Sequence, residues 1–395
     1  MKICFYCDSV FSFGGVQRVL AVVATALSRN HEVTILTTEP KTEENRKLYD
    51  MDKGNIHYEY ISYSSLPFYE FLPCKFYSFL YKSILPKTIL TTRWYGYSSF
   101  PKSHREKLIR IINDFDFDVV VGVHIFLSFQ LAGIKGNIKA KTVGWMHNSF
   151  DAFFLGPRPY LKNQEKRFSF QMPLLDRVVV LSDYDKNRFL EELKVDSVRI
   201  YNPLTIVPEG KGSPENKRFL SVGRFSPLHK GFDILINAFS IFAKVNKEWK
   251  LDIVGEGPEE DMLRSLIVKH NLEERIVIHP FTSDIGKHYS QGSIYVLSSR
   301  WEGLPLVLLE AMQYHLPIIA SKIPITREII ENRGFSEMFT NENVEELAEK
   351  MAIMADKPDL EEMGKQAFEY AKEFQLEPTI EKWGKLFTEI VKNGR

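Results

Sequence analysis

Cysteine, net charge and long apolar runs are all scarce in this sequence. Its 395 residues include three cysteines and equal totals of basic and acidic residues, 51 each. A small, odd number of cysteines is typical of a protein that keeps its thiols reduced rather than of a disulfide framework. A net charge of zero excludes the whole-molecule field that attracts nucleic acid or anionic lipid. We therefore expect no nucleic-acid partner, and anion recognition only at local sites.

No apolar run approaches the roughly 18 to 20 residues that a membrane-spanning helix needs. The chain also reaches a charge at Asp8 too early for a signal peptide. These two absences predict a cytoplasmic protein.

Two of the cysteines, Cys4 and Cys7, have the Cys-x-x-Cys spacing of redox and metal sites. The apolar run around them, 3–6, is typical of a strand, in which side chains three residues apart face opposite sides. We interpret them as buried structural cysteines rather than as redox or metal-binding groups.

Short apolar runs alternate with segments of helical periodicity along most of the chain. The first half begins with a strand over 3–6, a polar loop that ends in Gly14-Gly15, a helix over 16–28 and a strand over 32–37. Further strands are predicted at 118–123, 141–146, 176–181, 219–222, 250–254, 276–280, 294–297 and 318–320, with helices at 232–245, 259–269 and 305–314. This alternation predicts an α/β protein whose parallel sheets are covered on both faces.

A polar stretch with Gly and Pro, 208–217, separates the two halves. We predict two doubly wound, Rossmann-like domains, 1–199 and 200–375, and expect the final helix, 376–395, to pack back on the first domain. In such sheets ligands bind at the carboxyl ends of the strands. A ligand contacted by both domains would therefore lie in the cleft between them.

The segment 57–110 departs from this regularity because aromatic residues are interleaved with basic ones, among them Lys75, Lys82, Lys87 and Arg93. One interpretation is a set of helices that pack on the sheet while their basic side chains extend to solvent. The other is a surface that faces lipid or an acceptor, which would make the protein peripheral to the cytoplasmic face of a membrane. Both interpretations stay open.

A candidate anion site follows the strand predicted at 219–222. There Gly223 and Arg224 are followed by Lys230 and by Gly231, which opens a helix. Arg offers a planar fork of donors and Lys a point charge, so two cations six residues apart suit a diphosphate. Either residue alone would be interpreted as a solvated loop cation. Their joint position at the carboxyl end of a strand favours a functional role.

A second candidate site begins where the strand predicted at 294–297 ends. Pro305 is expected at the first helical position, where a missing N–H costs nothing. The free N–H groups of Gly303 and Leu304 would then be available to phosphate or sugar oxygens.

Two carboxylates, Glu302 and Glu310, flank this turn with seven residues between them. A carboxylate buried on the apolar helix would need partners, and a pair of ribose hydroxyls would provide them. Alternatively, Glu310 and Gln313 share an exposed stripe, as their spacing permits. Spacing alone supports the two interpretations equally.

Several motifs, taken in order, resemble those of glycosyltransferase family 4. They are Gly-Arg-x5-Lys-Gly at 223–231, Val-Gly-Glu-Gly-Pro at 254–258, the Glu-x7-Glu pair at 302 and 310, and the stretch 317–328. The loop at 14–19 also looks like the family's Gly-Gly-x-Glu-Arg-x loop, with Gln17 in place of the usual Glu. The resemblance covers essentially the whole chain and is sharpest over 219–330. It implies a GT-B fold, in which two Rossmann-like domains face a central cleft.

Carried over to this chain, the resemblance implies a nucleotide-sugar donor that is bound mainly by the second domain. Arg224 and Lys230 would bind its diphosphate. Glu310 would bind the ribose, and Glu302 the hydroxyls of the transferred sugar. The other residues expected at the donor are Gly14, Gly15, Gly223, Gly255, Gly303, Leu304, Pro305 and Leu306. Many members have Glu-Gly-Phe-Gly at 302–305, and the proline of this chain removes one backbone N–H from that site.

His147 follows the strand predicted at 141–146, at a place where related enzymes often hold a histidine near the donor sugar. A lone histidine is more often structural. Its position at the carboxyl end of a strand favours a catalytic role, beside Glu302, Arg224 and Lys230.

Neither a metal ion nor a cofactor is expected. Asp114 and Asp116 have the Asp-x-Asp spacing of metal-dependent sugar transferases, but they lie before the strand at 118–123, at its amino end. The nucleotide-sugar itself is a substrate.

The combined interpretation is a retaining, metal-independent hexosyltransferase. It would transfer a hexose from a nucleotide-sugar, with UDP as the expected carrier, to a glycan or lipid-linked oligosaccharide in the synthesis of a surface polysaccharide such as capsule, O-antigen or exopolysaccharide. The alternatives are a nucleotide-sugar epimerase of the same fold and a nucleotide-sugar-binding regulatory subunit without catalysis.

Overall fold

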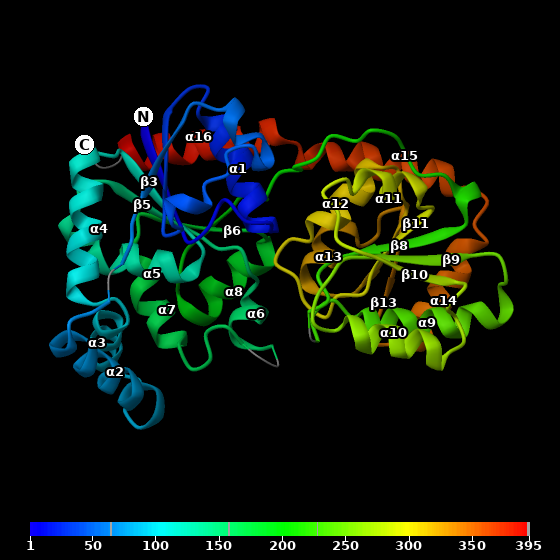
Figure 1. Ribbon diagram of the computed structural model, residues 1–395, viewed down its shortest axis with the longest axis horizontal. Coiled ribbons are helices and arrows are strands. Elements are labelled where there is room, and N and C mark those ends of the chain that lie inside the picture. The colour runs from blue at the N-terminus through cyan, green and yellow to red at the C-terminus, as the bar shows by residue number, and fades with distance from the viewer. Residues whose placement is uncertain (64, 157–158, 227, 393–395) are drawn as a thin grey trace. The chain divides into compact units, whose positions relative to one another are not determined.

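The chain divides into two compact units, each an α/β layer structure (Figure 1). The structure is a computed structural model and describes residues 1–63, 65–156, 159–226 and 228–392. Unit 1 comprises Met1–Thr205 and Leu376–Arg395, and unit 2 comprises Ile206–Gln375. The boundary lies six residues beyond the predicted end of the first domain at 199, because Asn202, Pro203 and Leu204 are buried and stay with unit 1.

Unit 1 contains a seven-stranded parallel sheet in the order β3-β2-β1-β4-β5-β6-β7. Its strands are β1 Lys2–Cys7, β2 Glu32–Thr37, β3 Ile56–Tyr60, β4 Val119–Val123, β5 Lys141–Trp145, β6 Arg177–Val180 and β7 Val198–Arg199. The central strand β1 is apolar and buried from its second residue onward, as its sequence predicts. Edge strand β3 was not predicted, because its alternating Ile-His-Tyr-Glu-Tyr lies within the aromatic segment.

The helices of unit 1 are α1 Gly15–Leu27, α2 Phe68–Ser83, α3 Ile89–Ser99, α4 Lys102–Phe115, α5 Ile125–Ile134, α6 Phe150–Phe154, α7 Glu165–Gln171, α8 Asp183–Leu193 and α16 Leu376–Lys392. Helix α16 packs on this unit, where Trp383 lies edge-on to Trp145 with ring centroids 4.9 Å apart. Figure 1 shows α16 beside α1. The last three residues of the helix predicted at 376–395 lie outside the described residues.

Helices α2 and α3 pack on each other as a hairpin. This packing contradicts one of the two interpretations of the aromatic segment 57–110. Only Tyr81 of α2 is buried. The interpretation in which these aromatic residues pack on the sheet is therefore wrong for α2, which packs on α3 instead. Among the described residues, no helix is both long and apolar enough to cross a bilayer.

Cys4 and Cys7 are both buried on β1 and are not disulfide-bonded. Burial raises the pKa of each thiol, which keeps both protonated. The prediction of buried, structural cysteines is confirmed.

Unit 2 contains a six-stranded parallel sheet in the order β10-β9-β8-β11-β12-β13. Its strands are β8 Arg218–Val222, β9 Lys250–Val254, β10 Ile276–His279, β11 Ile294–Leu297, β12 Ile318–Ser321 and β13 Ser336–Phe339. Its helices are α9 Phe232–Val245, α10 Glu260–Lys269, α11 Gly286–Gln291, α12 Leu306–Gln313, α13 Pro324–Ile330, α14 Val344–Ala355 and α15 Leu360–Ala371. In Figure 1, α9, α10 and α14 lie on one face of this sheet, and α11, α12 and α15 on the other.

The strand order reverses between β1 and β4 in unit 1 and between β8 and β11 in unit 2. Ligands of doubly wound sheets bind at the carboxyl ends of strands at such switch points. In unit 2 these ends lead into Gly223 and Ser298, so the two segments singled out in the sequence meet at one place.

Candidate active site

Glycines allow the strand ends of unit 2 to approach closely. A Cβ atom on Gly255 would lie 2.0 Å from the Gly223 carbonyl oxygen, and one on Gly231 would lie 2.1 Å from that of Ser298. Gly231 also has a φ of +65°, which favours glycine. The side chain of Lys230 also passes close to Gly223, because a Cβ on Gly223 would lie 3.3 Å from Cε of Lys230.

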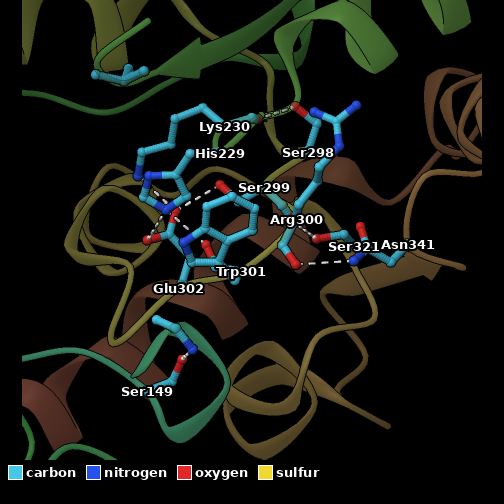
Figure 2. A network of polar contacts seen from close by, with 12 residues as sticks. Ser149, His229, Lys230, Ser298, Ser299, Arg300, Trp301, Glu302, Ser321 and Asn341 are labelled. Carbon is cyan, nitrogen blue, oxygen red and sulfur yellow. Dashed lines mark hydrogen bonds and ion pairs between the residues drawn. The ribbon is translucent and has the colours of Figure 1, made fainter. Parts of the chain in front are cut away.

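Lys230 and Glu302 form an ion pair at this switch point (Figure 2). The Nζ of Lys230 lies 2.6 Å from Oε1 of Glu302, and the hydroxyl of Ser299 donates to the same oxygen at 2.6 Å. The side chain of Glu302 is 8% exposed and that of Lys230 is 16% exposed. From the sequence, Lys230 was expected at the diphosphate and Glu302 at the sugar hydroxyls. The structure joins the two side chains in one ion pair.

The surroundings of Glu302 keep it ionised. Burial alone would raise the pKa of this carboxyl, but the charge of Lys230, assisted by His229, outweighs it and holds the pKa well below its ordinary value. The Nε2 of His229 lies 3.7 Å from the other carboxylate oxygen. Glu302 is therefore a fixed, charged acceptor.

His229 and Trp301 are two further residues of the site, to which the sequence motifs gave no role. Their rings stack with centroids 4.9 Å apart, and the Nε2 of His229 lies 2.9 Å from the Trp301 carbonyl oxygen. The neighbouring Arg300 makes a two-bond contact with Asp233, at 3.0 and 2.8 Å. These two bonds attach the loop that contains Glu302 to the first turn of α9. In the sequence, a role for His229 in the site was indicated only by its position directly before Lys230.

Glu310 is buried on α12 and is 2% exposed. The hydroxyl of Tyr289 donates to its Oε2 at 2.9 Å. The alternative in which Glu310 and Gln313 share an exposed stripe is wrong. The pKa of the Tyr295 hydroxyl is raised, first by burial and then by the charges of Glu302 and Glu310, so both carboxylates act on one buried tyrosine.

Helix α12 begins one residue later than predicted. Pro305 precedes it with a ψ of 90°, an extended conformation, and the helix starts at Leu306. Within the described part of the chain, the backbone N–H groups of Gly303, Leu304 and Leu306 donate no hydrogen bond. Unbonded N–H groups at a helix start are suited to anionic oxygens.

Arg224 is not part of the ion-paired cluster. Its side chain is exposed and makes no hydrogen bond or ion pair with any other described residue. It lies one residue beyond Gly223, which closely contacts the stem of Lys230. The structure therefore leaves one cation of the predicted diphosphate site uncommitted.

The other predicted site residues, Gly14, Gly15 and His147, belong to unit 1. Gly14 directly precedes α1, and its N–H donates to the hydroxyl of Tyr49 at 3.0 Å. Gly15 opens the helix and is exposed. The loop before them is held by the buried Glu39, whose Oε2 accepts from the N–H groups of residues 10 and 11 at 2.7 and 3.1 Å.

His147 lies two residues beyond β5 and is buried. Neither of its ring nitrogens has a hydrogen-bond partner among the described residues. Burial, with a smaller effect of His124, lowers its pKa to about 3. A buried imidazole without partners is costly for the fold, so this side chain is available to a ligand or to water.

The aspartates of the Asp-x-Asp motif lie at the amino end of β4, as predicted. Asp114 lies in the last turn of α4, and Asp116 caps that helix in a left-handed conformation with a φ of 52°. The next aspartate, Asp118, accepts from the N–H of Lys2 at 2.8 Å. In the described part of the chain, no three His, Cys, Asp or Glu side chains are grouped to hold a metal ion.

Two family models match the chain. The model of glycosyl transferases group 1 matches residues 206–373, and that of glycosyltransferase family 4 matches residues 13–210, half of the chain. The chain belongs to glycosyltransferase family 4. An uncharacterized glycosyltransferase of Haemophilus influenzae is 30% identical over 97% of this chain and 98% of its own length. The family resemblance drawn from the motifs is thus confirmed.

Two further similarities are informative. The amylovoran biosynthesis glycosyltransferase AmsD of Erwinia amylovora is 28% identical over 62% of this chain and 70% of its own. The crystal structure of HepE from Anabaena, in complex with UDP and glucose, matches 98% of this chain and 99% of its own with a TM-score of 0.72 at 16% identity. The latter likeness concerns the fold, and it confirms the predicted GT-B architecture of this glycosyltransferase.

Replacing Lys230 with Met should destabilise unit 2, because Glu302 stays buried and loses its main counter-charge. We expect the free energy of unfolding at pH 7 to fall by about 3 kcal/mol, the lower end of the range for breaking a buried ion pair, since Lys230 is partly exposed. The double variant Lys230→Met/Glu302→Gln removes both charges and should recover most of the loss. Urea denaturation of the wild type, both single variants and the double variant measures this.

The loss in free energy of unfolding caused by Lys230→Met should also depend on pH. In the wild type the pKa of Glu302 is lowered from 4.5, so the stabilisation is present above that pH and is lost as the pH falls through the folded pKa. In the Lys230→Met protein burial should raise this pKa, so the destabilisation should shrink between pH 7 and pH 5. An equal loss at both pH values, with no recovery in the double variant, would contradict the role of the ion pair.

Proposed function

We propose that this glycosyltransferase is a retaining, metal-independent enzyme that transfers a hexose from a UDP-sugar to a glycan or lipid-linked acceptor in surface polysaccharide synthesis. The observation that carries the proposal is the ion pair of Lys230 and Glu302 beside the N–H groups at the start of α12, which have no hydrogen-bond partner among the residues that the structure describes. Such a site offers positive charge to a diphosphate and a fixed acceptor to sugar hydroxyls. The complex of HepE with UDP and glucose supports the donor class, and the role of AmsD in amylovoran biosynthesis supports the acceptor class.

The reaction requires stabilisation of two developing charges. As the bond between the anomeric carbon and the phosphate oxygen breaks, negative charge grows on the nucleoside diphosphate and positive charge on the sugar. Lys230, Arg224 and the N–H groups before α12 would stabilise the diphosphate. These groups would take the place of a metal ion, because they supply the same positive field.

Retention follows when the acceptor hydroxyl attacks from the face that the phosphate leaves. The acceptor oxygen forms a bond to the anomeric carbon, and its proton passes to the departing phosphate oxygen. In this scheme no residue of the chain becomes covalently attached to the sugar.

The ion pair gives donor binding a specific consequence. A diphosphate beside Lys230 would share the lysine with Glu302. The carboxylate of Glu302 would then accept hydrogen bonds from the sugar hydroxyls as well. Binding of the sugar is thereby coupled to binding of the phosphates. Glu310, also buried, is the proposed acceptor for the ribose hydroxyls.

In unit 1, His147 is the proposed contact to the transferred sugar. With a pKa of about 3 it is neutral at physiological pH, so it offers one N–H donor and one acceptor rather than a charge. The Gly14-Gly15 turn at the start of α1 is the proposed backbone contact to phosphate or acceptor oxygens.

The stereochemical course tests the proposed reaction. Incubated with UDP-glucose and a panel of glycan and lipid-linked acceptors in EDTA, the enzyme should form a product with the anomeric configuration of the donor. Added Mg²⁺ or Mn²⁺ should change the rate less than about twofold, because the cations of the protein stabilise the leaving group. Proton NMR of the first product measures the configuration. An inverted linkage, or a rate that depends on the metal, would contradict the proposal.

Arg224, which makes no ion pair with a described residue, gives a second test. The substitution Arg224→Ala should weaken UDP binding by about 10-fold to 100-fold, the range for losing a charged hydrogen bond. The melting temperature should stay unchanged, because the side chain is exposed and unpaired in the described structure. Isothermal titration calorimetry and thermal unfolding measure the two effects. The control Arg264→Ala removes an exposed arginine of α10 and should alter neither.

Equal UDP affinity in the Arg224→Ala and wild-type proteins would remove Arg224 from the donor site.

A further inference from the structure

The hairpin of α2 and α3 carries an apolar outer surface that no described part of unit 1 covers. Of the 16 residues of α2, only Tyr81 is buried. Large side chains such as Phe68, Phe76 and Phe79 are 74%, 62% and 61% exposed, and Trp94 of α3 is 58% exposed. Soluble proteins rarely expose a contiguous apolar surface of this kind without a binding role. We call the exposed face of residues 66–99 the outer hairpin surface.

The base of the hairpin is well anchored, so the exposure is not a sign of poor packing. Tyr81 stacks on Tyr95 with ring centroids 4.2 Å apart and planes 7° apart, and its hydroxyl bonds to that of Thr92 at 3.0 Å. The guanidinium of Arg167 on α7 lies 5.0 Å from the Tyr95 ring centroid. Figure 1 shows α2 and α3 side by side. A rigid base with an uncovered outer face is the arrangement of a docking element.

The charge of this surface differs from that of the whole chain. Residues 66–99 contain four basic residues, Lys75, Lys82, Lys87 and Arg93, and a single acidic one, Glu70, so four minus one gives a net charge of +3, against zero for the whole chain. Glu70 accepts from the N–H of Ser103 at the start of α4. The negative charge is therefore engaged at the base of the hairpin.

The basic residues lie among the apolar ones. The Nζ of Lys75 lies 5.6 Å from the ring centroid of Phe71, and the guanidinium of Arg93 lies 6.0 Å from that of Tyr97. Aromatic rings with adjacent lysine and arginine groups suit the boundary between headgroups and acyl chains, where the rings enter and the cations stay at the headgroups.

We infer that the outer hairpin surface docks on an anionic lipid bilayer. Helix α2, at 16 residues, is shorter than the roughly 20 residues of a spanning helix, so it would lie in the interface rather than cross it. A second copy of the chain is a poorer occupant, because it would bring a charge of +3 against +3. Lysine is also depleted in protein interfaces, whereas this surface intersperses lysines with aromatic residues.

This inference goes beyond the proposed transfer reaction and does not depend on it. Vesicle flotation without donor or acceptor therefore tests it separately. The wild-type chain should bind vesicles of phosphatidylcholine with phosphatidylglycerol and should bind pure phosphatidylcholine much more weakly. The variant Lys75→Gln/Lys82→Gln/Arg93→Gln should lose about a hundredfold in partition coefficient, because each cation near such a surface contributes about a factor of five.

A matched control removes the same charge elsewhere. The variant Lys244→Gln/Lys250→Gln/Lys269→Gln alters three exposed lysines of unit 2 and should bind anionic vesicles as the wild type does. An apolar pair of variants completes the design. Phe76→Ser/Phe79→Ser should reduce binding with all charges intact, whereas Val245→Ser/Val268→Ser, at exposed valines of unit 2, should not.

Three results would overturn the inference. They are the absence of wild-type binding to anionic vesicles, an equal loss in the hairpin and control variants, and hairpin-dependent self-association in analytical ultracentrifugation without vesicles. The last result would assign the surface to a second copy of this chain.

Discussion

A buried carboxylate remains charged when a cation or hydrogen-bond donors compensate for its lost hydration, and Lys230 supplies the cation for Glu302. Much of the local structure of unit 2 depends on this ion pair. The stem of Lys230 lies close to Gly223, where a Cβ would be 3.3 Å from its Cε, so a side chain at position 223 would crowd the lysine. Ser299 donates to the same carboxylate oxygen as Lys230, and the Nε2 of His229 lies 3.7 Å from the other oxygen. The same pair places a cation and a hydrogen-bond acceptor at the switch point of the sheet.

The loops around the pair are fixed by contacts that do not themselves face a ligand. Arg300 joins the loop after β11 to Asp233 of α9, and Ser298 donates to the carbonyl oxygen of Lys230 at 2.9 Å. Close backbone approaches at Gly231 and Gly255 leave no room for side chains. These contacts hold the loops of the site in place, and groups fixed in advance are best suited to stabilise a charge that develops during a reaction.

The fold could be predicted largely from apolar periodicity. Helix α9 and strands β2, β9 and β11 have the predicted bounds, because each is a buried element whose pattern is unbroken. Strands β3 and β13 were missed because edge strands bury few residues. The exposure of α2 was undecided, since an apolar helix has the same sequence pattern whether it is covered by protein or by another partner.

The site could be predicted only in part. The motifs identified Lys230, Glu302 and Glu310, and family membership confirms the resemblance that named them. Contact between Lys230 and Glu302 could not be read from spacing, because 72 residues separate them and only the parallel strands β8 and β11 bring them together. The burial of Glu310 was equally hidden, since Tyr289, which donates to its carboxylate, belongs to another helix.

The most direct test of this account is a crystal structure of the enzyme with an unreacted UDP-sugar. We predict Lys230 between the diphosphate and Glu302, Glu302 bonded to a sugar hydroxyl, Arg224 ordered on the phosphates and Glu310 on the ribose. A nucleotide-sugar bound away from the carboxyl ends of β8 and β11, with the ion pair unchanged and in contact with no part of it, would contradict the central claim.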